Sequence, residues 1–297
     1  MDYEKYKSWF KTQGLKYLPD FLFPKFKPKI LDYIKKDKEN LGRIIGINLK
    51  PINFLDESQL SMFIEGILKL KSCDDTMFYI EGMEHIPKFI LIEIGKRTGL
   101  NFKFGDNTRI FNIPQIIIKA YDILEEDYNS KETLVICKDK ERLLELMQML
   151  SDHFKFLSVF GLDEVGKNEL YEAILEATGI SIFQPVQIDR LIKNYNIIIN
   201  FNDEIDFNIS NIRSDALIID FSEKKPFNLV DKKGIIIEDI NFELNIENEF
   251  IEKFVSPPFL ESLCEDWDKV FTRIKVKDSF YSIEEIIGLK VKLKGKF

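Results

Sequence analysis

The chain has 297 residues, of which 45% are hydrophobic and 31% are charged, and its formal net charge is -8 at pH 7. This composition excludes an intrinsically disordered chain, because it supplies enough apolar material for a packed core, and the length favours two domains. The negative charge disfavours nucleic acids and anionic membrane surfaces as partners, because the overall field of the protein repels phosphate groups.

Cysteine and histidine are too scarce to indicate a disulfide framework, a metal site or a serine triad, since the chain has three cysteines, far apart, and two histidines. His85 follows a predicted strand, where it would act as an acid or base or lie solvated in a loop, and His153 stands at a predicted helix end. The N-terminus is charged, and no window approaches an apolar span of about 18 residues. We therefore expect a cytoplasmic protein without a membrane segment.

Residues 1–40 are expected to form a helical segment in which a loop at residues 23–29 separates two helices. The loop contains Pro24 and Pro28, and proline interrupts a helix because it lacks the amide hydrogen and clashes with the preceding turn. Its lysines alternate with phenylalanines, which suits either a contact with an anion or partner, or a loop anchored to the core by its aromatic rings.

Residues 41–130 alternate short β-branched runs with longer amphipathic stretches, which predicts a first α/β lobe with a mainly parallel sheet covered by helices. The expected strands are RIIGINL, TMFYIEG and LNFKF, and the expected helices are ESQLSMFIEGILKLK, IPKFILIEIGKRTG and IPQIIIKAYDILEE. The polar stretch EDYNSKE then breaks the pattern.

Residues 131–245 continue the alternation and predict a second α/β lobe. The expected strands are TLVIC, FLSVF, ISIF, NIIINF, DALIIDF and GIIIEDI, and the expected helices are ERLLELMQMLSDHF, NELYEAILEATG and IDRLIKNY. These strands are apolar almost throughout, as strands of a parallel sheet buried on both faces must be.

Two segments of the chain look like the same unit used twice. Both run from a strand through a glycine and an acidic residue into a helix that ends in Thr-Gly, at Gly99 in the first lobe and Gly179 in the second. Each of these glycines can take the left-handed conformation that ends a helix. Either the two segments are an internal duplication, or they are two ordinary βαβ units that share turn chemistry.

A possible phosphate-binding motif begins at Gly161, because residues 161–168 read G-x-x-x-x-G-K-N between a predicted strand and helix. As a P-loop it would bind phosphate through Gly161, Gly166, Lys167 and Asn168. Asn168, however, replaces the hydroxyl residue that contacts magnesium, and the loop contains two acidic residues where backbone amides would surround a polyphosphate. We therefore favour a structural turn over a P-loop.

The order of elements from Glu132 to about Ile240 resembles the NAD(P)-binding Rossmann domain of the shikimate dehydrogenase and glutamyl-tRNA reductase group. TLVIC corresponds to the first strand, FLSVF to the second, NIIINF to the fourth and DALIIDFSEKKPFN to the fifth. The resemblance implies an NAD(P) cofactor near the strand ends, with Lys138, Asp163, Asn200 and Asn202 as candidate cofactor-binding residues.

The first turn of this domain departs from that group, because CKDKERLL contains no glycine. Glycines in this turn let the backbone approach a pyrophosphate and leave the following helix N-terminus open to it. The resemblance and this departure together predict an α/β fold of two Rossmann-like lobes, the second of them degenerate. The cofactor stays unassigned.

Residues 246–297 are expected to form a C-terminal helical segment that packs back on the lobes, with PPFLESLCEDWDKVFTRI as a helix and KVKLKGKF as a cationic tail of unassigned role. Carboxylates gather at predicted strand ends, where they would line a cleft or simply begin the following helices. The residues are Glu81, Glu84, Asp163, Glu164, Asp203, Glu204, Asp220, Glu238 and Asp239.

The leading functional hypothesis is a small-ligand-binding or regulatory module, in which any ligand would bind in the cleft between the lobes. One alternative is an NAD(P)-dependent oxidoreductase related to the group named above, and a second is a P-loop-like nucleotide-binding enzyme. The catalytic residues, the substrate and the oligomeric state are left open.

Overall fold

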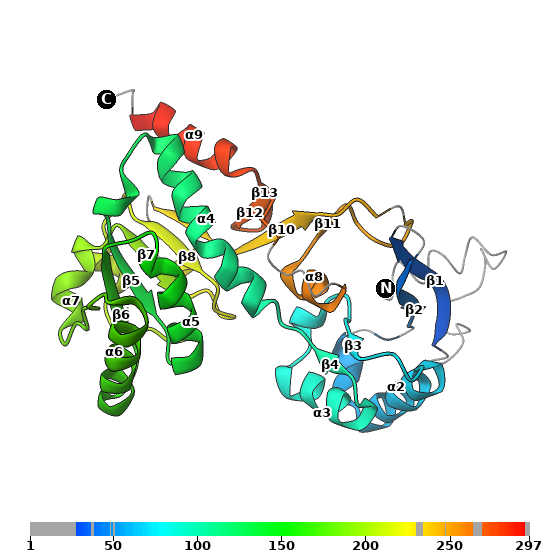
Figure 1. Cartoon of the computed structure of the whole chain (residues 1–297). Coiled ribbons are helices and arrows are strands. Elements are labelled where there is room, and N and C mark those ends of the chain that lie inside the picture. The colour runs from blue at the N-terminus through cyan, green and yellow to red at the C-terminus, as the bar shows by residue number, and fades with distance from the viewer. Residues whose placement is uncertain are drawn as a thin grey trace. The chain divides into compact units, whose positions relative to one another are not determined.

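The computed structural model describes residues 28–36, 39–47, 49, 51–229, 234–246, 248–263 and 269–294. It is an α/β structure that divides into two compact units (Figure 1). Unit 1 comprises the described residues of Met1–Asp106 and Leu244–Trp267, and unit 2 those of Asn107–Glu243 and Asp268–Phe297.

The division between the units falls after Asp106, whereas the sequence predicted it after residue 130. Helix α4 (Asp106–Leu124) is the reason, because its side chains bind elements of unit 2. Arg109 forms an ion pair with Asp239, and the side chain of Asn112 accepts a hydrogen bond from the Phe271 amide at 2.8 Å. A helix that is apolar on one face carries no sequence signal for which core will bury it.

The N-terminal part of unit 1 is a hairpin, not the second helix predicted for residues 1–40. Strands β1 (Lys29–Lys36) and β2 (Glu39–Gly46) pair antiparallel, with Ile30 opposite Ile45 and Ile34 opposite Gly42. The apolar spacing of the β1 sequence fits a helix or a strand. It forms a strand because β2 is there to pair with it. The predictions for residues 1–27, including most of the basic loop, lie outside the described residues, and Lys29 at the end of that loop is the first residue of β1.

Helices α2 (Glu57–Leu70) and α3 (Lys88–Thr98) pack together in unit 1 and bury Phe63 and Ile94. Strands β3 (Met77–Phe78) and β4 (Asn101–Phe102) pair parallel, as predicted, but each has two residues. β2, which was expected in the same sheet, pairs antiparallel with β1 instead. The remaining elements of unit 1 are β11 (Phe254–Val255) and α8 (Pro257–Leu263).

Unit 2 contains the parallel sheet that the second series of elements predicted. Its strands lie in the order β6-β5-β7-β8-β9 and all neighbouring pairs are parallel. The strands are β5 (Glu132–Ile136), β6 (Phe156–Phe160), β7 (Ile197–Asn200), β8 (Leu217–Asp220) and β9 (Ile235–Ile237).

A single bridge extends this sheet beyond β6. The predicted strand ISIF is reduced to Phe183, whose amide donates to Leu157 O and whose carbonyl oxygen accepts from Val159 N, both at 2.9 Å. With Phe183 as the third element along this part of the chain, the spatial order is 3-2-1-4-5-6, which is the Rossmann order. Unit 2 is therefore a Rossmann-like domain with a minimal third strand.

Helices α5 (Lys140–Ser151) and α6 (Glu164–Thr178) lie side by side and follow β5 and β6 (Figure 1). A short helix, α7 (Ile188–Leu191), precedes β7. The short 3-10 helices of the described chain are Pro51–Leu55, Met83–His85, Tyr128–Ser130, Ile192–Asn194, Ile209–Asn211 and Pro226–Leu229. No helix in the described ranges is both long and apolar enough to cross a membrane.

The two Thr-Gly helix ends have the same geometry, as the sequence comparison predicted. Gly99 ends α3 with φ 65° and Gly179 ends α6 with φ 71°, both left-handed. In each helix the threonine hydroxyl before the glycine donates to the carbonyl oxygen four residues back, at 2.7 Å from Thr98 and 2.8 Å from Thr178. The resemblance between the two segments thus extends to their side-chain hydrogen bonds.

The helix predicted for residues 257–274 is confirmed only at α8, its residues 264–268 lie outside the described residues, and a strand replaces it from Arg273 in unit 2. Strands β10 (Asp239–Glu243), β12 (Arg273–Val276) and β13 (Ser279–Tyr281) pair antiparallel in that order, and helix α9 (Ile283–Lys294) follows. Ile274, the last residue of the predicted helix, lies in β12 and is fully buried.

Gly161, the first residue after β6, provides a test of the turn that positions the site. It has φ 120°, and a Cβ atom there would lie 2.8 Å from the carbonyl oxygen of Cys137. Gly161→Ala should therefore lower the free energy of unfolding by about 1–3 kcal/mol, measured by urea denaturation. Gly288→Ala is the matched control, because the space around this α9 glycine is open and alanine favours a helix by up to about 1 kcal/mol. Equal effects would contradict the strain at Gly161.

Candidate functional site

The candidate site lies at the carboxyl ends of β5, β6 and β7, where ligands bind in open parallel sheets. The chain leaves β5 toward β6 on one side and reaches β7 on the other, so the crevice between β5 and β7 is the topological switch point. Four predicted residues gather around it: Lys138 after β5, Gly161 after β6, Asn200 at the end of β7 and Asn202 beyond it.

The side chain of Asn202 lies beside the turns that follow β5 and β6. Its Oδ1 accepts a hydrogen bond from the backbone amide of Lys138 at 3.0 Å, and a Cβ atom on Gly161 would lie 3.2 Å from its Nδ2. Asn200 fixes the Asn202 backbone, since its Oδ1 accepts from Asn202 N at 3.0 Å and its Nδ2 donates to Asn202 O at 2.9 Å. The amide that would face a pyrophosphate in a glycine-rich turn is therefore already bonded within the chain.

Carboxylates cap both helices that begin beside the crevice. Asp139 caps α5, where its Oδ1 accepts from Arg142 N at 3.0 Å, and Asp163 caps α6, where its Oδ1 accepts from Gly166 N at 2.8 Å. Such caps satisfy amide groups that would otherwise be available to an anion. Asp163, one of the four candidate cofactor-binding residues, thus has a structural partner.

The proposed P-loop residues form the turn and first turns of α6 and not a loop that wraps a phosphate. α6 begins at Glu164, so two residues separate Gly161 from the helix, and Gly166, Lys167 and Asn168 are already helical. The Lys167 ammonium lies 2.7 Å from a carboxylate oxygen of Glu164. The reason is that Asp163 is a strong N-cap and starts the helix early.

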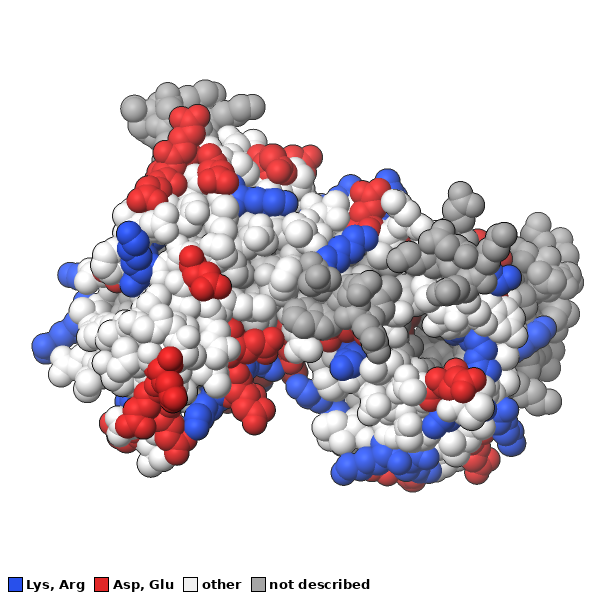
Figure 2. Space-filling view, viewed as in Figure 1, with Lys and Arg blue, Asp and Glu red and all other residues white. Residues whose placement is uncertain are grey.

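Figure 2 shows acidic side chains gathered over the region of α6 on the face that it displays. The α6 sequence contributes four glutamates along fifteen residues, and the Lys140 ammonium of α5 pairs with one of them, Glu169. This concentration of negative charge disfavours a polyphosphate at the start of α6.

A buried polar network continues the site across the ends of β7 and β8. The carboxylate of Asp220 is fully buried and accepts from Asn200 Nδ2 at 2.8 Å and Ser222 Oγ at 2.6 Å. The backbone amides of Ser222 and Phe227 also donate to this carboxylate, with nitrogen–oxygen distances of 3.2 and 3.4 Å. The Asp220 carboxylate therefore holds the turn after β8 closed.

Lys225 joins β8 to the segment after β9. Its ammonium donates to the backbone oxygens of Asp220 at 2.7 Å and Glu238 at 2.6 Å, from a backbone with φ 49°. Burial lowers the pKa of Lys225, while the carboxylates of Asp239 and Asp220 act in the opposite direction. Sequence analysis did not single out Lys225, because neither its left-handed backbone nor its buried ammonium has a sequence signal.

Arg109 and Asp239 form a bidentate ion pair in unit 2, with Nε–Oδ1 at 2.9 Å and Nη2–Oδ2 at 3.0 Å. Burial raises the pKa of Asp239, but the charge and hydrogen bonds of Arg109, together with Lys225, lower it to below its usual value. Asp239 was among the carboxylates that the sequence placed at strand ends, whereas Arg109 was not predicted to contribute.

Both histidines lie outside these networks. His85 is exposed in unit 1, with its Nε2 3.7 Å from a Glu84 carboxylate oxygen, and His153 follows α5 with its ring 6.3 Å from that of Phe154. Within the described ranges, no three or more His, Cys, Asp and Glu side chains are grouped so that they could hold a metal ion.

Comparison with known proteins shows distant structural similarity alone. No family model matches the chain, and no curated protein matches it. The L-tryptophan dehydrogenase of Nostoc punctiforme is similar over 63% of this chain at 14% identity and a TM-score of 0.36. The chain covers 54% of that dehydrogenase, about half its length.

One of the dipicolinate synthase subunits of Bacillus halodurans is similar over 74% of this chain and 72% of its own, at 14% identity and a TM-score of 0.37. Similarity at these TM-scores carries no information about the activity of this chain.

The P-loop alternative predicts that Lys167 binds a phosphate, whereas the structure shows it in an ion pair with Glu164. Lys167→Ala should change the free energy of unfolding by no more than about 0.5 kcal/mol, because the pair lies on the surface of one helix. ATP or GTP with magnesium should leave the melting temperature of the wild type unchanged. A nucleotide-induced rise in melting temperature that disappears in Lys167→Ala would establish a phosphate site here.

The Arg109–Asp239 pair predicts a pH dependence of stability. The unfolded carboxyl titrates near pH 3.9 and the folded one lower, so its stabilising effect is present above about pH 4 and is lost as the pH falls through the folded pKa. Urea unfolding between about pH 6 and pH 2 should show a smaller loss of stability for Asp239→Asn than for wild type. Asp206→Asn, which changes an exposed carboxylate, should retain the wild-type pH dependence.

Proposed function

We propose that this chain is a small-ligand-binding or regulatory module. We also propose that its Rossmann-like domain does not bind a dinucleotide in the crevice after β5. The observation that carries the proposal is the hydrogen bond between the Lys138 amide and the Asn202 side chain. A pyrophosphate that entered the crevice would have to displace the Asn202 side chain from the Lys138 amide, and so break an exposed hydrogen bond that contributes about 0.5–1.5 kcal/mol net.

The charges around the crevice support the same proposal. Asp139 and Asp163 place carboxylates on the amides where two helices begin, and a dinucleotide brings a further doubly charged group. Each cap stabilises its helix by about 0.5–2 kcal/mol, so its displacement opposes binding. Lys138 is exposed, but one flexible ammonium does not reproduce the close backbone approach that glycines provide.

The alternative is an NAD(P)-dependent oxidoreductase, and one observation favours it. The strands of unit 2, with the Phe183 bridge included, lie in the Rossmann order, and the buried Asn200 ends β7, the fourth strand, beside which the nicotinamide lies in the group that the sequence resembles. This alternative requires that Asn202 moves out of the crevice when the cofactor enters.

Calorimetry with NADH and NADPH separates the two functions. We expect no saturable heat at about millimolar cofactor with the wild type, which sets the binding free energy weaker than about -4 kcal/mol. Asn202→Asp, which adds a negative charge beside the Lys138 amide, should behave in the same way. Its matched control is Asn211→Asp, an exposed asparagine elsewhere in unit 2.

Saturable binding of either cofactor to the wild type and to Asn211→Asp, abolished in Asn202→Asp, would replace the proposal with the oxidoreductase. The sensitivity to Asn202 is essential, because it places the cofactor in the crevice and not elsewhere on the protein.

A further inference from the structure

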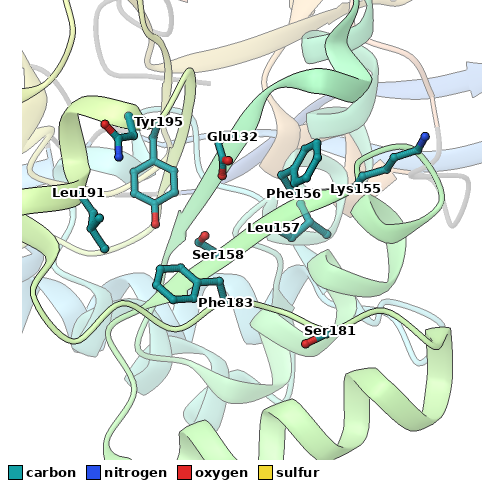
Figure 3. Close-up of a pocket in the computed structure, with 10 residues that line it drawn as sticks. Glu132, Lys155, Phe156, Leu157, Ser158, Ser181, Phe183, Leu191 and Tyr195 are labelled. Carbon is teal, nitrogen blue, oxygen red and sulfur yellow. The ribbon is translucent and has the colours of Figure 1, made fainter.

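A second hollow of unit 2 lies at the opposite edge of the same sheet, where the strands begin (Figure 3). It has a volume of about 350 Å³, within the range of small-molecule sites. Glu132 and Phe156 are the first residues of β5 and β6, and Asn194 and Tyr195 lie three and two residues before the start of β7 at Ile197. None of these residues takes part in the crevice described above.

Two aromatic side chains on this pocket are exposed although their backbones are held in the sheet. Phe183 is 54% exposed and Phe156 is 49% exposed. The Phe183 backbone is bonded in both directions to β6, so its ring is presented from a fixed position. Exposed aromatic rings that flank a pocket are typical of a surface that binds a ligand or partner.

The inner part of the pocket is polar. Tyr195 and Ser158 are buried, at 3% and 2% exposure, and Figure 3 shows the Tyr195 hydroxyl directed toward the Ser158 hydroxyl. Burial raises the pKa of Tyr195, the hydrogen bond to Ser158 lowers it and Glu132 raises it, with a net rise. The phenol therefore stays neutral at physiological pH and adds no negative charge of its own.

Glu132 supplies the negative charge of the pocket. Its backbone is clamped by Asn196, which accepts from the Glu132 amide at 3.2 Å and donates its own amide to the Glu132 carbonyl at 2.9 Å. Figure 3 shows the Glu132 carboxylate on the same side as the Tyr195 and Ser158 hydroxyls, whereas the Lys155 ammonium points away from them. Lys155 therefore does not neutralise the carboxylate within the pocket.

We propose that this pocket binds a small organic cation whose positive nitrogen carries apolar substituents, with Glu132 as the counter-charge and the exposed ring of Phe183 as the aromatic contact. A carboxylate beside aromatic rings is the combination that recognises alkylated ammonium groups, because the ring faces attract the charge and cover the alkyl groups. A hydrated metal ion lacks the apolar surface that Phe183 and Leu191 would cover. The inference rests on the proposed function, since it assigns that module a ligand class and a site.

The experiment compares choline and benzyltrimethylammonium with their neutral isosteres, in which a tert-butyl group replaces the trimethylammonium group. Calorimetry on the full chain should give saturable binding of the cations and at least about tenfold weaker binding of the isosteres. Glu132→Gln and Phe183→Leu should each weaken cation binding about fivefold to tenfold.

Glu172→Gln and Phe280→Leu are the matched controls. Each makes the same substitution at an exposed residue of unit 2 outside the pocket, and both should bind the cations like the wild type. Circular dichroism and the melting temperature of each variant exclude loss of fold as the cause of weakened binding.

Three outcomes would overturn the assignment: no saturable cation binding, equal affinity for cations and isosteres, or equal effects of pocket variants and controls. Each of these leaves the proposal about the crevice intact, because that proposal is tested separately by the response of NADH binding to Asn202→Asp. Conversely, binding of a dinucleotide in the crevice would contradict the proposed function, whether or not the cations bind to the pocket.

Discussion

The hydrogen bond from the Lys138 amide to the Asn202 side chain is the contact on which the carboxyl end of the unit 2 sheet depends. A backbone amide at the end of a buried strand must have a partner, from the chain, from water or from a ligand. Dinucleotide-binding turns leave this role to the ligand, and their glycines give it access. Here the turn contains Lys138, Asp139 and Lys140, and the chain supplies the acceptor itself.

Other polar groups along this edge of the sheet are also hydrogen-bonded by side chains of the chain itself. Asp139 and Asp163 satisfy amides of the two helices that follow, and Asp220 accepts four hydrogen bonds from the turn after β8 and from Asn200. Lys225 then ties β8 to the segment after β9. The polar groups of these residues are therefore hydrogen-bonded to one another, at the end of the strands where open parallel sheets usually bind ligands.

The amino edge of the sheet has the opposite chemistry. Exposed rings of Phe156 and Phe183 stand beside buried hydroxyls and the carboxylate of Glu132. An exposed aromatic ring contributes little to the stability of the folded protein, because much of its apolar surface stays in water. The exposed rings and the carboxylate of this pocket therefore lie at the end of the strands opposite to the one where open parallel sheets usually bind ligands.

Local patterns determined much of the fold. The apolar runs TLVIC, FLSVF, NIIINF and DALIIDF identified four strands of the parallel sheet, since period and β-branching act within a few residues. The Thr-Gly pairs ending at Gly99 and Gly179 likewise marked the ends of α3 and α6 correctly. The absence of glycine after TLVIC indicated that this turn differs from the glycine-rich turn of dinucleotide-binding domains.

Tertiary structure decided the features that depend on a partner far away in the chain. The run before Lys36 became a strand because β2 pairs with it, α4 joined unit 2 because Asp239 and Phe271 bind it, and the predicted strand at Phe183 shrank to a single bridge. The hydrogen bond between the Lys138 amide and Asn202 joins residues 64 positions apart, and the pocket beside Glu132 is lined by residues of neighbouring strands. Periodicity contains no information on such pairs, because it records which face of an element is apolar and not which surface will cover it.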